Sequence, residues 1–299
     1  MRPKLDRNRR GDTSVIETSA SAEDRLFQAL SGVGAGYLVV VTGAGISLAS
    51  GIPTFRGNDP DAVWSKSVME MGTRSYFMSD PVGSWSWYLS RFDQVLEKQP
   101  NPAHTALARM ERWQQGRGGE FVLVTQNVDP LHERAGSEAL VKVHGSADRA
   151  RCIKDGCVNA APSGSVARDT LDLTRFMAEP SREALPRCTV CNGLLRQHVL
   201  WFDEYYQEHN DYQWERVMDA AARADVMLFV GTSFAVGVTS LFLESAIKRS
   251  VPALSIDPGV DATPHPLVLS LPEKAEELLP GVMARLDNQE SSDQSMSIR

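Results

Sequence analysis

The chain has 299 residues, 42% of them hydrophobic, which is enough to bury one large core or one core with a small satellite domain. Its 31 basic and 38 acidic residues give a net charge of -7, so the chain has no overall positive charge that would attract nucleic acid or anionic lipid. No apolar stretch approaches the ~20 residues needed to span a bilayer. Residues 1–24 lack the apolar segment of a secretory signal. We therefore expect a cytoplasmic protein that binds neither membranes nor nucleic acid, with no particular oligomeric state favoured.

Short apolar, β-branched runs alternate with helical patterns along the chain. Five runs that end in Gly, Asn, Ser or Asp are predicted strands: 37–43, 120–127, 139–145, 225–233 and 251–257. Helical patterns lie between them, for example over 104–115 and 212–224. This alternation predicts an α/β fold with a Rossmann-like doubly wound parallel sheet, and it places ligand sites at the carboxyl ends of the strands.

Two stretches interrupt the alternation and are predicted to form a second, smaller zinc-binding domain. They are a helical module over 55–100, rich in aromatic residues, and a module over 146–200 that contains the cysteines. The large domain then comprises 23–54, 101–145 and 201–286. Residues 1–22 and 287–299 are polar enough to be predicted as disordered tails.

Four cysteines occur as two pairs, which indicates a metal site in a reducing compartment. Cys152 and Cys157 are separated by four residues, and Cys188 and Cys191 by two. Four thiolates at this spacing are typical of tetrahedral Zn²⁺, and they leave no position for a catalytic water, so the predicted role is structural. Four unrelated buried thiols or a redox pair are the alternatives.

The stretch "TGAGISLASGIPTFRG", residues 42–57, follows the first predicted strand. Gly43 and Gly45 let the backbone approach a pyrophosphate where a helix begins, although such a turn is also a common fold device. Thr54, Phe55 and Arg56 follow on a loop that we expect to fold over the nicotinamide end of NAD. Such a loop suits an enzyme that consumes the dinucleotide.

Several ordered motifs then identify a family. "GAGISLASGIPTFRG", "TQNVDPLHERAG", "VHGS", the cysteine pairs, "LRQHVLWFDE" and "GTSFAVG" make residues 25–285 resemble the sirtuin family of NAD-dependent protein-lysine deacylases. The resemblance implies a large NAD-binding domain, a small zinc domain, and a cleft that admits NAD from one side and an acyl-lysine peptide from the other. It also implies the products nicotinamide, O-acyl-ADP-ribose and free lysine.

The resemblance assigns roles to individual residues. His144 becomes the general base, and Asn127 a catalytic residue that holds the ribose and nicotinamide together with Asp129. A structural histidine at a strand end is the alternative for His144, and His132 is predicted to be only a packing or capping residue. The implied NAD-binding set is Gly43, Ala44, Gly45, Thr54, Phe55, Arg56, Gln126, Asn127, Val128, Asp129, Gly231, Thr232, Ser233, Asp257 and Ala275.

Two of these positions carry qualifications. The "GTS" turn at 231–233 is also compatible with an ordinary helix N-cap. Asp257 stands where the family usually has asparagine; its carboxylate accepts from both ribose hydroxyls and repels a 2'-phosphate, which favours NAD over NADP.

Tyr88 and Arg91 concern the acyl group. They are three residues apart, on one face of a predicted helix, and resemble the Tyr-x-x-Arg pair with which some sirtuins bind the carboxylate of succinyl- or malonyl-lysine. The alternative is a core tyrosine and a solvated arginine. Thr54 stands where many deacetylases have an aspartate or glutamate, which also favours the hypothesis of a succinyl or malonyl substrate.

The segment "LRQHVLWFDE" departs from the family at Gln197, usually proline, and at Asp203, usually glycine. Its apolar side chains are expected to line the peptide channel, with His198 as a wall or core residue. The added carboxylate of Asp203 is expected either to narrow the channel or to attract lysine-rich peptides.

Three hypotheses about function follow. The first is a protein-lysine deacylase that removes acetyl groups, succinyl or malonyl groups, or both. The second is an NAD hydrolase or ADP-ribosyltransferase on the same scaffold, which would release nicotinamide without an acyl-lysine. The third is a non-catalytic NAD-binding module, against which the set of Asn127, Asp129 and His144 argues.

Overall fold

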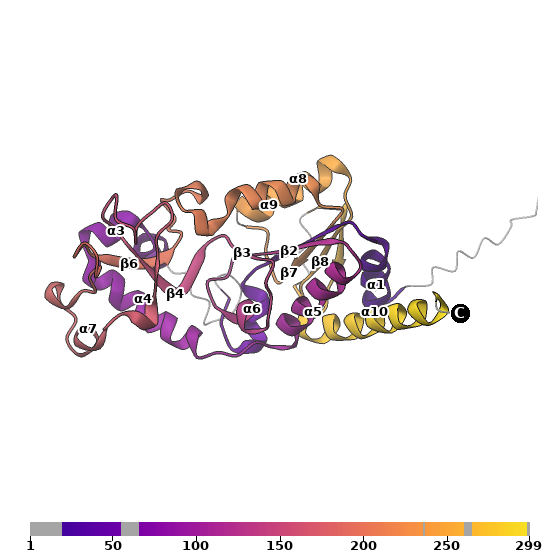
Figure 1. The fold of residues 1–299 in the computed structure, drawn as a ribbon, viewed down its shortest axis with the longest axis horizontal. Coiled ribbons are helices and arrows are strands. Elements are labelled where there is room, and N and C mark those ends of the chain that lie inside the picture. The colour runs from indigo at the N-terminus through magenta and orange to yellow at the C-terminus, as the bar shows by residue number, and fades with distance from the viewer. Residues whose placement is uncertain (1–19, 55–65, 236, 260–264, 298–299) are drawn as a thin grey trace, which may run out of the picture.

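The computed structural model describes residues 20–54, 66–235, 237–259 and 265–297. Figure 1 shows two parts side by side along the longest axis of the molecule. One part contains the large sheet with β1, β2, β7 and β8, and the other contains β4 and β6 with helices α3, α4 and α7. None of the helices formed by these described residues is long and apolar enough to cross a membrane.

The large sheet has six parallel strands in the order β3-β2-β1-β7-β8-β9. Their bounds are β1 Tyr37–Thr42, β2 Glu120–Thr125, β3 Leu140–Lys142, β7 Val226–Val230, β8 Ala253–Ile256 and β9 Val268–Leu271. The doubly wound sheet is thus confirmed, with strands shorter than predicted and with β9 in addition. Because the strand order reverses between β1 and β7, a ligand crevice is expected at the carboxyl ends of these two strands.

Helices cover both faces of this sheet, because successive side chains of a strand point to opposite faces and both faces are apolar. Leu38 and Val40 of β1 pack with α1 (Ala22–Gly32), α5 (Pro102–Gly116) and α10 (Ala275–Ser297). Val39 and Val41 pack with α8 (Trp214–Arg223) and α9 (Gly237–Arg249). Figure 1 shows these two helical layers above and below the strands.

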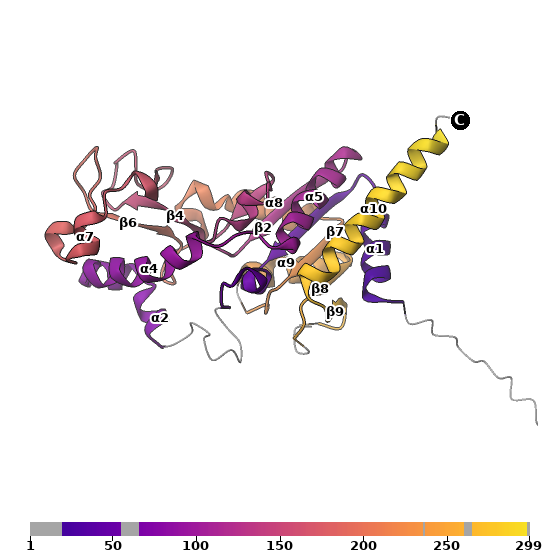
Figure 2. The same cartoon turned by 90° about the horizontal axis from the view of Figure 1, so that it is seen from below.

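The C-terminal helix corrects one prediction. Residues 287–299 were predicted to be a disordered tail, but α10 continues to Ser297. Its first turns bury Leu279, Met283 and Leu286 against α1 and α5, and helix propagation from this anchored segment costs little. The Ser31 hydroxyl also donates to the Gln289 side chain at 3.3 Å. Figure 2 shows the helix running beside α1 and α5.

The smaller domain is built around a three-stranded antiparallel sheet, β5-β4-β6. Its strands are β4 Gly145–Cys152, β5 Val166–Ala167 and β6 Leu195–Val199; its helices are α2 Lys66–Met71, α3 Arg74–Ser79, α4 Pro81–Leu96 and α7 Thr174–Ala178. Phe77, Trp85, Phe176 and Trp201 fill its core. Both predicted insertions therefore contribute side chains to one apolar cluster.

The remaining elements are short connections. They are α6 Leu131–Arg134 and the 3₁₀ helices η1 Ala44–Ser50, η2 Arg168–Thr170, η3 Arg182–Ala184, η4 Tyr206–Glu208 and η5 Asn210–Tyr212. The helix expected after Gly43 is thus the 3₁₀ helix η1, which ends where Gly51 adopts a left-handed conformation.

Candidate active site

Polar residues from the ends of four neighbouring strands meet at the reversal point of the large sheet. Gly43 follows β1 and Gln126 follows β2, while His144 follows β3 and Thr232 lies just beyond β7. Parallel strands end on the same edge of a sheet, so these residues, far apart in sequence, lie next to one another.

The glycines of this edge allow the loops after β1 and β7 to cross closely. The Gly45 amide donates to the Gly231 carbonyl at 2.9 Å, and the Gly43 amide donates to the Val230 carbonyl at 3.1 Å. A Cβ on Gly45 would lie 2.7 Å from the Gly231 Cα, and Gly231 itself has φ +59°. Loop packing by itself therefore requires glycine at these positions, independently of any bound phosphate.

Asn127 and Asp129 are held by hydrogen bonds with buried neighbours. The Asn127 side-chain amide donates to the Gly43 carbonyl at 3.0 Å and to the Ser47 hydroxyl at 3.3 Å. Ser47 in turn donates to Asp129 at 3.0 Å, and the Leu131 amide donates to the other carboxylate oxygen at 3.1 Å. Burial raises the pKa of Asp129 in spite of these donors. Ser47 thus joins the site, a role that the sequence analysis missed although the residue lies within its glycine motif.

Gln126 connects three strand ends. Its side-chain amide donates to the Thr42 carbonyl and to the Thr232 hydroxyl, both at 3.2 Å. Its carbonyl accepts from Nδ1 of His144 at 2.8 Å. Ser233 is exposed beside this group.

His144 is therefore fixed in one tautomer. Because Nδ1 carries the proton that bonds to Gln126, Nε2 keeps its lone pair and faces the Tyr206 hydroxyl at 3.3 Å. The Tyr206 ring stacks on Trp214 at 4.3 Å and on the imidazole at 5.9 Å. Burial lowers the pKa of His144 to about 4, so the ring is neutral near pH 7. Tyr206 was missed by the sequence analysis, because nothing in its local pattern points to His144.

Tyr88 and Arg91 lie on α4, in the small domain. The Tyr88 hydroxyl accepts from Nε1 of Trp201 at 2.8 Å, and burial raises the pKa of this phenol, which keeps its own proton. The Arg91 guanidinium lies 4.1 Å from the centre of the Trp87 ring and donates to the Trp87 carbonyl at 3.2 Å. It forms no ion pair with a carboxylate in the part of the chain that the structure describes. The pair can therefore offer a hydroxyl proton and a positive charge to an anion.

The other predicted NAD-binding residues are more dispersed. Ala44 begins η1, Thr54 is half-buried, and the carbonyl of Val128 accepts from the Ala147 amide of β4. Asp257 follows β8, where burial raises its pKa, and Ala275 begins α10 within the apolar core. Phe55 and Arg56 lie outside the described residues.

Asp203 acts as a helix cap. Its carboxylate accepts from the amides of Arg74 and Ser75 at 2.7 and 3.1 Å, at the beginning of α3. The charge expected to narrow the channel or attract peptides is therefore engaged at a helix N-terminus, where it is stabilised. His198 is buried as expected, and so is His132, whose Nε2 lies 3.1 Å from the Thr42 hydroxyl.

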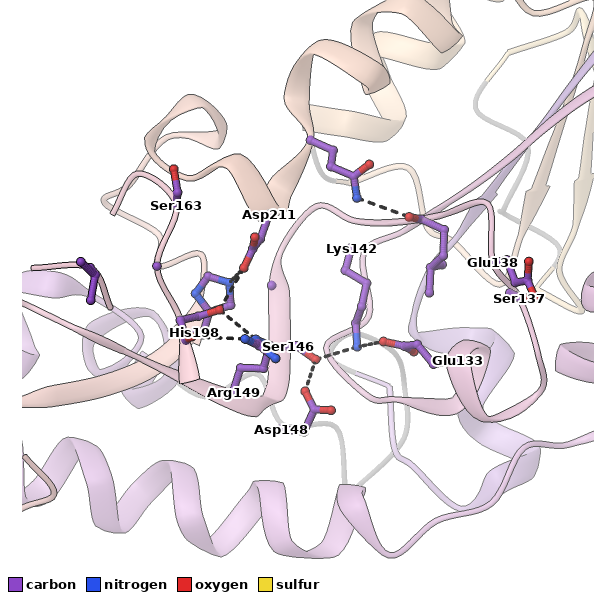
Figure 3. A pocket seen from close by; sticks show the side chains of 16 residues that line it. Glu133, Ser137, Glu138, Lys142, Ser146, Asp148, Arg149, Ser163, His198 and Asp211 are labelled. Carbon is purple, nitrogen blue, oxygen red and sulfur yellow. Dashed lines mark hydrogen bonds and ion pairs between the residues drawn. The ribbon is translucent and has the colours of Figure 1, made fainter. Parts of the chain in front are cut away.

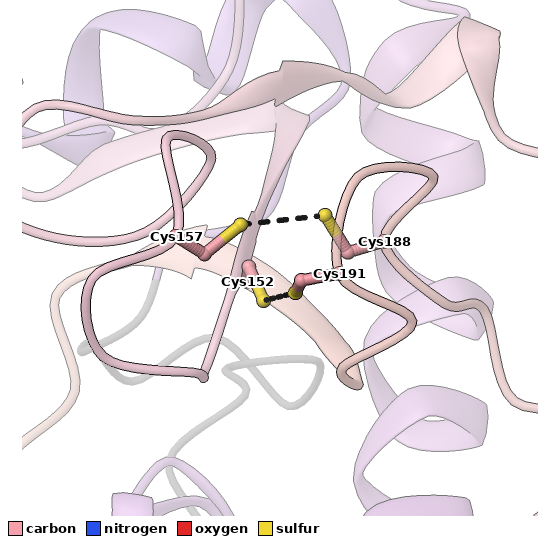
Figure 4. Close-up of side chains that lie close together, drawn as sticks. All are labelled: Cys152, Cys157, Cys188 and Cys191. Atoms are coloured by element: carbon pink, nitrogen blue, oxygen red, sulfur yellow. Dashed lines mark hydrogen bonds between the residues drawn. The ribbon is translucent and has the colours of Figure 1, made fainter.

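The four cysteines converge at one end of the small sheet, as Figure 4 shows. The sulfur atoms of Cys152 and Cys191 are 3.4 Å apart, those of Cys157 and Cys188 are 3.6 Å apart, and all four lie within 4.8 Å of one another. A Zn–S bond of about 2.3 Å in a tetrahedron separates the sulfurs by about 3.8 Å, so the ion fits. Main-chain amides of Lys154 and Gly193 donate to two of the sulfurs, as expected for thiolates. The cluster forms a structural zinc site, and the cysteines are not paired as disulfides.

Comparisons with known proteins agree with this arrangement. The model of the Sir2 family matches residues 43–238. The chain is 36% identical over 250 residues to the NAD-dependent protein deacylase of Mycolicibacterium paratuberculosis, covering 83% of this chain and 97% of that protein. It is 36% identical over 236 residues to the NAD-dependent protein deacylase sirtuin-5, mitochondrial, of Danio rerio, covering 76% and 75%. A crystal structure of a Sir2 homologue in complex with NAD superimposes with a TM-score of 0.71 at 34% identity, covering 89% and 94%.

Proposed function

Because the chain belongs to the Sir2 family, we propose that its strand-end cluster binds NAD and that His144 is the general base of the reaction. The chain is an NAD-dependent protein deacylase, which consumes NAD as a co-substrate. The observation that carries the proposed roles is found at the reversal point of the sheet, where His144 is hydrogen-bonded to Gln126 and Asn127 is hydrogen-bonded to the Gly43 carbonyl.

The reaction joins an amide oxygen to a ribose carbon. The acyl oxygen of the substrate lysine attacks C1' as nicotinamide leaves with its bonding electrons, and water later completes the release of free lysine and O-acyl-ADP-ribose. An amide oxygen is a poor nucleophile, so the enzyme must above all hold the two partners in line. Asn127 and Asp129 suit this task, because buried hydrogen bonds already fix both side chains.

His144 would then accept the proton of a ribose hydroxyl. This frees the 2'-oxygen to attack the carbon of the former amide. Nε2 has the lone pair that the step needs, because Nδ1–H is bonded to the Gln126 carbonyl. The low pKa of His144 keeps the base unprotonated near neutrality.

We further propose that Tyr88 and Arg91 bind the carboxylate of a succinyl or malonyl group. The Arg91 guanidinium has no carboxylate partner among the described residues, so it can donate to an anion. The Tyr88 oxygen already accepts from Trp201, so its hydroxyl proton serves as the second donor. Stacking on Trp87 restricts the orientation of the guanidinium, so less entropy is lost when an anion binds. The peptide substrate is a protein segment that carries such an acyl-lysine.

The test is mass spectrometry of the products from NAD with matched acetyl-lysine and succinyl-lysine peptides. Variant His144→Ala should lose deacylation of both peptides. Variant Arg91→Met should lose mainly the succinyl reaction, because it removes the charge and keeps the packing on Trp87. Arg117→Met is the matched control, since Arg117, just after the end of α5, lies 4.5 Å from the centre of the Trp113 ring in the same kind of contact.

Each outcome decides between the hypotheses. Loss of O-succinyl-ADP-ribose but not of O-acetyl-ADP-ribose in Arg91→Met, with both products kept in Arg117→Met, supports the acidic-acyl pocket. Equal loss of both acyl reactions in Arg91→Met would contradict it and leave the general deacylase. Nicotinamide release without peptide, at the rate measured with peptide, would instead favour the NAD hydrolase or ADP-ribosyltransferase.

A further inference from the structure

A second group of metal-binding side chains lies away from the cysteines. His198 comes from β6, and His209 and Asp211 come from the segment around η5. Nε2 of His198 is 3.0 Å from Oδ2 of Asp211, and Nδ1 of His209 is 3.8 Å from the same oxygen. One ligand atom from each residue lies within 4.8 Å of the other two. A tetrahedral zinc ion with bonds of about 2.0 Å separates its ligand atoms by about 3.3 Å. Nε2 of His198 would therefore move slightly away from Oδ2 of Asp211, and Nδ1 of His209 slightly toward it.

The surroundings orient two of these side chains as a metal site requires. Nε2 of His209 donates to the Gly164 carbonyl at 3.1 Å, which leaves Nδ1 with its lone pair on the side of Asp211. The Ser165 hydroxyl donates to Oδ2 of Asp211 at 3.1 Å and fixes the carboxylate. Nδ1 of His209 accepts from the main-chain amide of Asp211 at 3.2 Å, and a metal ion bound at Nδ1 would replace this hydrogen bond.

His198 provides an independent indication. Its side chain is 1% exposed, yet neither ring nitrogen has an aligned hydrogen bond with any described residue. Nε2 is near the Asp211 carboxylate without the geometry of a hydrogen bond. The exposed carboxylate of Asp211 is the one acidic group that the described residues bring close to this buried imidazole, and a cation bound by both Nε2 and Oδ2 would satisfy both groups.

The group is also accessible. His198 and Asp211 line a cavity of about 630 Å³, together with Ser163, Gly164 and Ser165. Figure 3 shows His198, Asp211 and Ser163 at this cavity. Among the residues that the structure describes, none predicted to bind NAD or the acyl group lines this cavity. The Asp211 side chain is 42% exposed, so an ion can reach the group from solvent. The nearby Arg151 is ion-paired with Glu204 at 3.1 Å, which offsets its repulsion of a cation.

We propose that His198, His209 and Asp211 bind a divalent zinc ion, separate from the four-cysteine site, with its fourth position open to the cavity. Two imidazoles and one carboxylate are donors that zinc prefers, and three protein ligands leave room for water or an anionic ligand. The ion would connect β6 of the small domain to the segment that leads into α8 of the large domain. This proposal stands on the geometry of the three ligands and does not depend on the roles proposed for the deacylase site.

The test uses the full-length protein with its four-cysteine site already filled with zinc. Equilibrium dialysis against micromolar free zinc, followed by metal analysis, should give two zinc ions per chain. Variants His209→Ala and Asp211→Asn should retain one, whereas the control His265→Ala, which changes a histidine outside the group, should retain two. Cobalt added to the zinc-loaded protein should give visible absorption bands without the near-ultraviolet charge transfer of thiolate ligands.

Folding and binding are separated in the same samples. Asp211→Asn keeps the size of a half-exposed side chain, so circular dichroism of its one-zinc form should match that of the wild type. Zinc should raise the melting temperature of the wild type and of His265→Ala, but not that of Asp211→Asn. A single zinc per chain in the wild type, or a second zinc that persists in Asp211→Asn, would overturn the proposal.

Discussion

The contact between Tyr206 and His144 gives a measurable pH effect. Tyr206→Phe removes the hydroxyl that lies 3.3 Å from Nε2 but keeps the ring that stacks on Trp214. A donor to this lone pair stabilises the neutral imidazole, so its removal raises the pKa of His144. For a long, neutral hydrogen bond worth about 0.5 kcal/mol, the rise is about 0.4 pH units.

The assay is kcat/KM for the acyl-peptide, measured over a pH range of about 4 to 8. The acid limb of Tyr206→Phe should lie at higher pH than that of the wild type, and its kcat/KM at neutral pH should fall about two- to threefold through lost orientation of the ring. Tyr205→Phe is the control, because the neighbouring Tyr205 is 72% exposed. Superimposable acid limbs in Tyr206→Phe and the wild type would refute the role given to this hydroxyl.

Four further results are expected. Glu204→Gln should lower the free energy of unfolding by about 3–5 kcal/mol in denaturant titrations, because it leaves the guanidinium groups of Arg151 and Arg196 buried without their carboxylate. Asp203→Gly should lower the free energy of unfolding by about 1 kcal/mol, which lowers the melting temperature by about 2–4 °C, and KM for the peptide should not change. A large change in KM would instead support a role of Asp203 in the peptide channel. Chelation of the structural zinc should unfold the small domain, as measured by tryptophan fluorescence. Added zinc, but not magnesium, should restore the folded state. Burial lowers the pKa of His104 from 6.5 to about 4, so the unfolded chain takes up the proton at higher pH than the folded one. The free energy of unfolding should therefore fall by up to about 3 kcal/mol as the pH drops from 6.5 to 4. His104→Gln should flatten this pH dependence in denaturant titrations.

Local patterns in the sequence determined the framework of this protein. The runs that became β1 and β2 are rich in valine and threonine, and the run that became β7 is apolar throughout, as a strand buried on both faces requires. The four cysteines were recognised for a similar reason, since two short ligand pairs in one insertion have few other uses. The glycine turn was also recognised, although only the structure showed that Gly45 must let the Gly231 loop pass.

The tertiary structure decided what depends on contacts between distant segments. Asp203 caps a helix that begins more than a hundred residues earlier in the chain, and Tyr206 meets a histidine from another strand end. Likewise, the polar C-terminus is helical because the turns before it are anchored on α1 and α5. Periodicity and spacing report only what a residue does with its near neighbours along the chain. Which carboxylate, phenol or imidazole a side chain finally faces is set by the packing of elements that are far apart in sequence.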